Sequence, residues 1–170
     1  SSTLLSLIAQ WTQVDPYQLA SMTFGGSGYD IACASAEGPI SYQIKDNQPI
    51  VKAIQWTPPF KDHCCFVHLG EKKDTQEALS MYTSMDISDK ASIQNKIADI
   101  NDRILSTIQI NEFCAAIEDH EVLISQSLNI EKVKDLRFSD FIGSIKSLGA
   151  WGGDFVLAAS EQDISRTITY

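Results

Sequence analysis

The sequence predicts an α+β fold. Two long segments, residues 88–108 and 111–128, carry apolar residues at helical spacings. Short apolar and β-branched runs, such as 40–44 and 154–159, are bounded by Gly, Pro, Asp and Asn and are typical of strands. These helices and strands do not alternate in the regular order of a doubly wound sheet, which favours α+β over parallel α/β.

The first 56 residues predict helices followed by a hairpin. Ser1, Ser2 and Thr3 are good capping residues, and Leu4, Leu5, Ile8 and Trp11 follow them on a helical period. The expected elements are a helix from the first residues, a short helix after Asp15-Pro16, a helix over 31–36 after a glycine turn, and strands 40–44 and 50–56 joined by Asp46-Asn47.

Residues 57–170 predict a larger unit, and we place a domain boundary between Trp56 and Thr57, just before Pro58-Pro59. Asp74 can cap a helix that begins at Thr75. The expected elements are a strand over 64–69, helices from 75, over 88–108, over 111–128 and over 139–144, and strands 145–148 and 154–159 around a glycine-rich turn.

The composition describes an acidic globular chain. Thirteen Lys and Arg against 22 Asp and Glu give a net charge of −9, so a polyanion would be repelled at long range. We therefore expect neither nucleic acid nor membrane as a partner, and no apolar run has the length of a membrane span. Four cysteines without metal-binding spacing indicate reduced thiols and a cytoplasmic protein. Because the chain starts at Ser1 without Met, we expect it to be a fragment.

Three segments could carry chemistry. Ser1-Ser2-Thr3 at a helix start could bind phosphate or its magnesium ion, although most such starts are only caps. Gly25 to Asp30 could bring a backbone close to a ligand and present Asp30 as a proton acceptor, or it is a glycine turn with a capping Asp. Gly149 to Asp154 holds three glycines around Trp151, which suits either a loop against a ligand or a tight hairpin. Lys72 and Lys73 could neutralise a phosphate, or they are simply solvated.

Taken together and in this order, these segments resemble the GHMP kinase superfamily. Ser1-Ser2-Thr3 is similar to the end of the glycine-rich second motif of that family, and Gly26-Ser27-Gly28-Tyr29-Asp30 is similar to the segment with the catalytic aspartate in mevalonate-pathway kinases. Lys146 and the run from Gly149 to Asp154 resemble the third motif, Gly-Ala-Gly-Gly-Gly. The resemblance implies a ferredoxin-like C-terminal domain over 57–170 and, over 1–56, a remnant of the N-terminal phosphate-loop domain.

The implied activity is ATP-dependent phosphoryl transfer to a small-molecule alcohol or phosphate, with ATP and Mg²⁺ as cofactors. Asp30 would orient or deprotonate the substrate hydroxyl, and Gly28, Lys72 and Lys73 would contact the substrate. Either Ser1 or Ser2 would contact phosphate, and the metal contact is assigned to Ser2. The expected nucleotide-binding residues are Ser1, Ser2, Gly149, Ala150, Gly152 and Gly153.

Two departures keep alternatives open. Trp151 stands where the family usually has glycine, and the glycines of the second motif are not present before Ser1, so this chain alone is expected to be inactive. A sugar kinase of the same superfamily and a non-catalytic ligand-binding or interaction domain are the alternatives. A further alternative is self-association of the fragment, since a missing half would leave apolar surface exposed.

Overall fold

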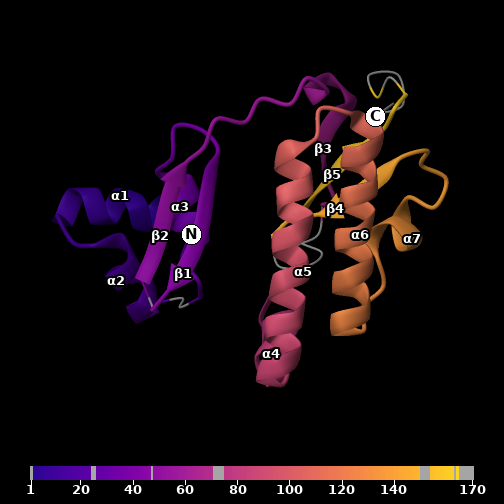
Figure 1. Cartoon of the computed structure of the whole chain (residues 1–170). Helices are drawn as coiled ribbons and strands as arrows, with labels where there is room; N and C mark the ends of the chain where they lie inside the picture. Colours follow the sequence, from indigo (N-terminus) through magenta and orange to yellow (C-terminus); the bar gives the residue numbers. More distant parts are fainter. Residues whose placement is uncertain are drawn as a thin grey trace. The chain divides into compact units, whose positions relative to one another are not determined.

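A computed structural model describes residues 2–23, 26–46, 48–70, 75–149, 154–162 and 164 of the chain. The chain divides into two compact units, Ser1–Trp56 (unit 1) and Thr57–Tyr170 (unit 2) (Figure 1). Both units combine helices with small antiparallel sheets, which agrees with the predicted α+β class. A ferredoxin-like arrangement stays a prediction.

Unit 1 has a small core made by its helices. Leu5, Ala20 and Ile31 are buried together, one from each helix, with Tyr17 and Leu19 packed against them. The break after the first helix has the predicted cause, because Asp15 Oδ1 accepts a 2.8 Å hydrogen bond from the Gln18 backbone N–H. The elements are α1 (Ser2–Thr12), α2 (Pro16–Thr23), α3 (Tyr29–Ala34) and the antiparallel pair β1 (Ile40–Lys45) and β2 (Gln48–Ala53).

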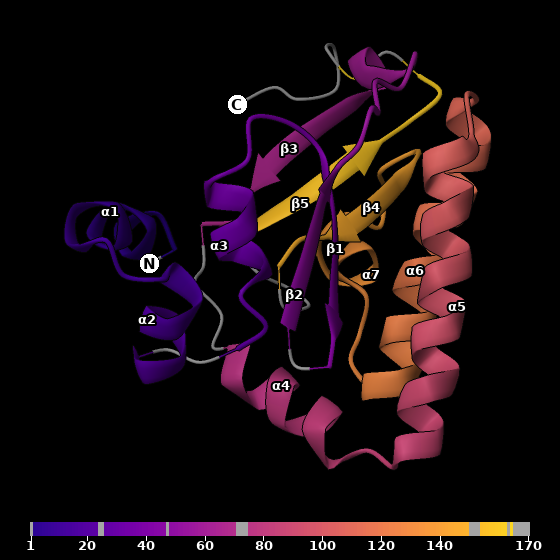
Figure 2. The same cartoon turned by 60° about the vertical axis from the view of Figure 1, so that its left-hand side comes forward.

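Unit 2 is built on a three-stranded antiparallel sheet with β5 in the centre (Figure 2). His68 pairs with Phe155 at one end of the sheet, and Cys64 and Ser144 both pair with Ala159 at the other. The elements are η1 (Lys61–His63), β3 (Cys64–His68), α4 (Thr75–Ser84), α5 (Ile87–Ser106), α6 (Ile110–Leu128), α7 (Val133–Arg137), β4 (Ser144–Ser147) and β5 (Phe155–Ala159).

The two faces of this sheet pack against different helices. On one face Ser144 Oγ donates a 3.0 Å hydrogen bond to the Cys114 carbonyl of α6, and Lys146 reaches the same helix. Ile145 lies between them in the strand and points to the opposite face, because side chains alternate along a strand. There it joins a buried apolar cluster that includes Val133 of α7, Val156 and Ala158.

The long helices α5 and α6 confirm the predictions for 88–108 and 111–128. Their apolar residues meet in the core, where Ile100, Phe113, Ala116, Ile117, Ile124 and Leu128 are buried. Arg103 of α5 and Asp119 of α6 add an exposed ion pair of 2.6 Å. Helix α5 ends at Ser106, slightly before the predicted end, because Thr107 adopts an extended backbone with ψ 144°.

The predicted helix over 139–144 is wrong. The short helix of this region is α7, and the chain after it makes a turn in which the Phe141 N–H donates to the Phe138 carbonyl. Gly143 then passes so close to the neighbouring strand that a Cβ on it would lie 2.3 Å from the Ala159 carbonyl oxygen. Ser144 already belongs to β4, so strand pairing takes the residues that the prediction gave to a helix.

Candidate functional site

Gly28 and Asp30 lie at the start of α3, as the sequence suggests. Gly28 is the N-cap with φ 76°, and its carbonyl accepts the first helical hydrogen bonds from Ile31 and Ala32. A Cβ on Gly28 would lie 2.8 Å from Tyr17 Cδ1, so both the backbone angle and the close approach of the ring require glycine. The Tyr42 hydroxyl donates a short hydrogen bond to the Ser27 carbonyl and ties this turn to the hairpin.

Asp30 is exposed in the first turn of α3. It is not the capping residue of the helix, because that position belongs to Gly28 and lacks a side-chain cap. The exposed carboxylate is therefore accessible to solvent or to a substrate. The pKa of the neighbouring Tyr29 is raised, mainly by its burial and next by the negative charge of Asp30. Its phenol is neutral at neutral pH.

Gly149 occupies the turn that follows β4. Its φ of 75° favours glycine, and a Cβ on it would meet no atom of the described residues within 4 Å. Two backbone hydrogen bonds organise this end of the sheet: the Leu148 N–H donates to the Phe155 carbonyl at 3.1 Å, and the Leu69 N–H donates to the Asp154 carbonyl at 2.7 Å. The residues that follow β3 and the turn between β4 and β5 therefore leave the sheet at one edge.

The remaining predicted residues divide between the two units and the undescribed positions. Ser2 begins α1 in unit 1 with its side chain partly buried, and unit 1 also holds Gly28 and Asp30. Gly149 belongs to unit 2. The residues that lie outside the described part of the chain are Ser1, Lys72, Lys73, Ala150, Gly152 and Gly153.

A buried polar cluster joins α6 to the end of β4, directly before Gly149. Lys146 Nζ lies 3.0 Å from His120 Nδ1 and 3.6 Å from Glu121 Oε1. Glu121 Oε1 also lies 3.4 Å from His120 Nδ1, and Glu121 Oε2 accepts a 3.0 Å hydrogen bond from Ser147 Oγ. The side chains of Glu121 and Lys146 are only 7% and 21% exposed, so these contacts form away from bulk water.

Burial disfavours the charged form of both Glu121 and Lys146, but their other contacts offset this effect to different extents. Burial would raise the pKa of Glu121, but the hydrogen bond from His120, the Lys146 charge and the bonds from Ser147 outweigh it, so this pKa is lowered. Burial lowers the pKa of Lys146, and its more distant contact with Glu121 offsets only part of this effect. The carboxylate is thus well satisfied, whereas the ammonium is held at a cost.

Sequence reasoning missed His120 and Glu121, although a signal was present. Glu121 lies in the same row of α6 as Ile117 and Ile124, both of which are buried. A carboxylate in the apolar row of an amphipathic helix needs a buried partner, because an unpaired buried charge is very costly. The partner is Lys146, which precedes the glycine-rich turn in the sequence.

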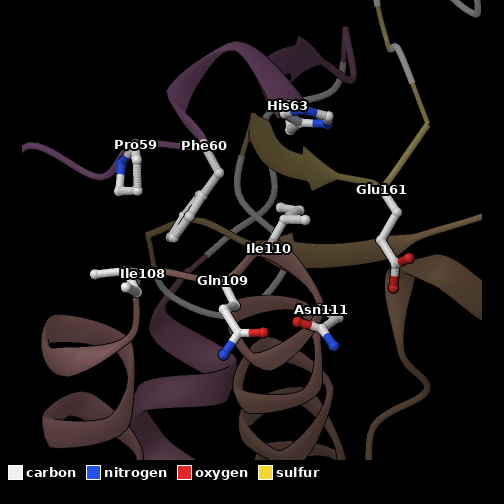
Figure 3. Close-up of a pocket in the computed structure, with 8 residues that line it drawn as sticks. All are labelled: Pro59, Phe60, His63, Ile108, Gln109, Ile110, Asn111 and Glu161. Carbon is white, nitrogen blue, oxygen red and sulfur yellow. The ribbon is translucent and has the colours of Figure 1, made fainter.

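The sequence also did not indicate a hollow at the other end of the sheet (Figure 3). Its volume is about 370 Å³, near the lower limit for small-molecule sites. His63 is anchored there by a 3.0 Å contact between Nδ1 and the Ser160 carbonyl oxygen. The lining residues are Pro59, Phe60, His63, Ile108, Gln109, Ile110, Asn111 and Glu161.

The described residues lack two common kinds of functional feature. Among them, no group of three or more His, Cys, Asp or Glu side chains could hold a metal ion. None of their helices is long and apolar enough to cross a membrane. All four cysteines are free thiols, as expected. Comparison of the chain with protein-family models, with curated proteins and with solved structures gave no match in any of the three.

Proposed function

We propose that this chain is part of an ATP-dependent kinase that phosphorylates a small-molecule alcohol or phosphate. The observation that carries the proposal is the sheet edge at Gly149. There, Gly149 has a left-handed backbone and an added Cβ would meet no described atom within 4 Å, while the Leu69 N–H after β3 donates to the Asp154 carbonyl just before β5. Turns of this kind present backbone N–H groups to phosphate oxygens, because glycine lets the ligand approach the backbone.

Two positively charged residues of the sequence support the proposal that this edge of the sheet binds phosphate. Lys72 and Lys73 follow β3 in the sequence, after Gly70, and the glycine-rich run follows β4. Because β3 and β4 both end beside the start of β5, the two segments leave the sheet at the same edge. Two lysines and a glycine-rich turn are a combination that suits the phosphates of a nucleotide in an otherwise acidic chain.

Asp30 supports the acceptor half of the reaction. In the proposed step the acceptor oxygen attacks the γ-phosphorus of ATP, the bond to the bridging oxygen of ADP breaks, and the acceptor proton passes to the Asp30 carboxylate. An exposed carboxylate in the first turn of α3, held beside the tightly constrained Gly28, suits this role. Mevalonate-type alcohols are the first acceptors to test, because the Gly26–Asp30 segment is most similar to mevalonate-pathway kinases.

Ser2 of unit 1 is the residue proposed to contact a magnesium ion. It is the first residue of the 11-residue helix α1, where a hydroxyl beside the first backbone N–H groups fits a phosphate or its metal ion. A bound Mg²⁺ would supply charge neutralisation of the transferred phosphoryl group.

The test is turnover by the product of the complete gene, so that the result does not depend on where this chain begins. ADP release is measured with a panel of small alcohols and phosphorylated alcohols for the wild type and for Asp30→Asn. Loss of a general base should lower kcat by about 10²–10⁴-fold. Asp46→Asn is the matched control, because Asp46 is an exposed turn residue at φ 52°, a conformation that Asn also adopts.

Two results would overturn parts of the proposal. Unchanged turnover by Asp30→Asn would remove Asp30 from the mechanism. Binding of ATP by the wild type without ADP release for any acceptor would replace the kinase with a non-catalytic ligand-binding domain. The sequence feature that favours a non-catalytic ligand-binding domain is Trp151, which stands where the third motif of the GHMP kinases usually has glycine.

A further inference from the structure

The polar cluster on α6 and β4 is an unusual way to hold two elements together. Lys146 and Ser147 are neighbours in a strand, yet both contact the same Glu121 carboxylate. Neighbouring strand residues normally point to opposite faces, so a shared partner requires the last residues of β4 to turn toward α6. The cluster therefore sets the direction in which the chain leaves β4 and enters the turn at Gly149.

Two sets of contacts among the described residues lie just before Gly149. One is the backbone hydrogen bond from the Leu148 N–H to the Phe155 carbonyl. The other is the cluster in which Lys146 and Ser147 both contact Glu121. A Cβ on Gly149 would meet no atom of the described residues within 4 Å, so the contacts described on this side of Gly149 are those of the residues that precede it.

Stability is a poor explanation for this cluster. A buried ion pair contributes little net stability compared with well-packed apolar residues of similar volume, because both charges lose their hydration. Elsewhere the same helix contributes buried apolar side chains such as Ile117, and its Cys114 carbonyl accepts a hydrogen bond from Ser144 Oγ of β4. A costly buried ion pair next to the glycine turn suggests that geometry is what this cluster supplies.

We propose that Lys146 is a positioning residue, which holds Gly149 in place for nucleotide phosphates through His120 and Glu121 of α6. This inference rests on the proposed kinase function. Lys146 itself need not touch the nucleotide, because its Nζ is already engaged by both side chains of the helix. Its effect on the reaction is then expected in nucleotide affinity more than in the chemical step.

The experiment compares Lys146→Met with Lys134→Met in the product of the complete gene. Lys134 is a fair control, because its Nζ donates a 2.6 Å hydrogen bond to the Gly143 carbonyl and so tethers the other end of β4. Lys146→Met should raise the KM for ATP about tenfold or more and change the KM for the acceptor little, since small displacements of binding groups are costly. Lys134→Met should leave the KM for ATP unchanged, although it too removes a contact that holds β4.

The double variant Lys146→Met with Glu121→Gln separates positioning from folding. Removing both charges removes the unpaired buried carboxylate, so thermal stability should recover toward the wild type. The KM for ATP should stay raised, because the contact of Lys146 with α6 is still missing. Recovery of that KM together with stability would show that Lys146 acts only through the fold, and the inference would be wrong.

A second readout does not depend on ATP turnover. The Leu148 N–H bonds to the Phe155 carbonyl next to the turn, so its hydrogen exchange reports local order. Exchange should accelerate at least about tenfold in Lys146→Met and stay near the wild-type rate in Lys134→Met. Equal rates in both variants would refute the positioning role. If exchange responds but the wild type shows no kinase activity, the proposed function fails while the link between Lys146 and the turn stands.

Discussion

Replacement of Gly28 by alanine tests whether the turn before Asp30 is as constrained as the structure indicates. Two effects add at this position. The left-handed backbone with φ 76° costs about 1 kcal/mol for a residue with a side chain. The new Cβ would also lie 2.8 Å from Tyr17 Cδ1 and 3.1 Å from Tyr17 Cε1, and overpacking of this kind costs about 1–3 kcal/mol. Gly28→Ala should therefore destabilise unit 1 by about 2–4 kcal/mol.

Gly26→Ala is the matched control for this prediction. Gly26 has φ 89°, but a Cβ on it would meet nothing within 4 Å, so only the backbone cost of about 1 kcal/mol applies. Urea unfolding of the whole chain, followed by NMR signals of residues in α1 and α3, measures the loss in unit 1 for each variant. In a Tyr17→Ala background the clash is absent, and Gly28→Ala should cost no more than Gly26→Ala.

Equal costs for the two glycines in the otherwise unchanged chain would refute the reasoning, because the contact with Tyr17 would then contribute nothing. Failure of Tyr17→Ala to relieve Gly28→Ala would do the same. A large loss that does depend on Tyr17 would show that glycine at position 28 is demanded by packing within unit 1. A ligand is then not needed to explain that glycine.

Two further predictions concern unit 2. Gly143→Ala should destabilise this unit by about 3 kcal/mol or more, because its Cβ would lie 2.3 Å from the Ala159 carbonyl oxygen. Gly149→Ala is the control and should cost only about 1 kcal/mol, because at φ 75° its Cβ would meet no described atom within 4 Å. Thermal unfolding measures both variants, and equal shifts of their melting temperatures would contradict the prediction. Burial raises the pKa of Cys64 from 9.0 to about 11, so its alkylation by iodoacetamide in the native chain should stay slow until the pH approaches 11. Because the folded chain keeps this proton longer than the unfolded chain, the same thiol should reduce stability as pH rises from 9 to about 11, and a Cys64→Ala variant should lose less over that interval.

The parts of the fold that the sequence predicts well are those with long, regular patterns. In α5 and α6 the apolar residues recur over several turns, so local preference and burial indicate the same structure. The helix expected over 139–144 had no such support. Its residues have no sustained period, and pairing of Ser144 with Ala159 together with the tight approach at Gly143 decided their conformation. Those are contacts with a strand that comes later in the chain.

The same distinction applies to the candidate site. Gly28 and Gly149 both adopt left-handed angles, as glycines in turns often do, and the sequence alone drew attention to both. The sequence did not link α6 to β4, because Glu121 and Lys146 are far apart in the chain and each taken alone is an ordinary charged residue. Only the alternation of faces in β4 and the packing of α6 bring them within 3.6 Å.

That link also changes how the glycine-rich turn is interpreted. Taken by itself, a left-handed glycine after a strand fits a simple hairpin as well as a phosphate site. A hairpin of this kind needs only its backbone hydrogen bonds, and those are present at Leu148 and Phe155. It does not need a carboxylate buried in the apolar row of a neighbouring helix, with a lysine held there against the cost of burial. In the proposed function, this additional polar anchor fixes the position of the turn for its ligand.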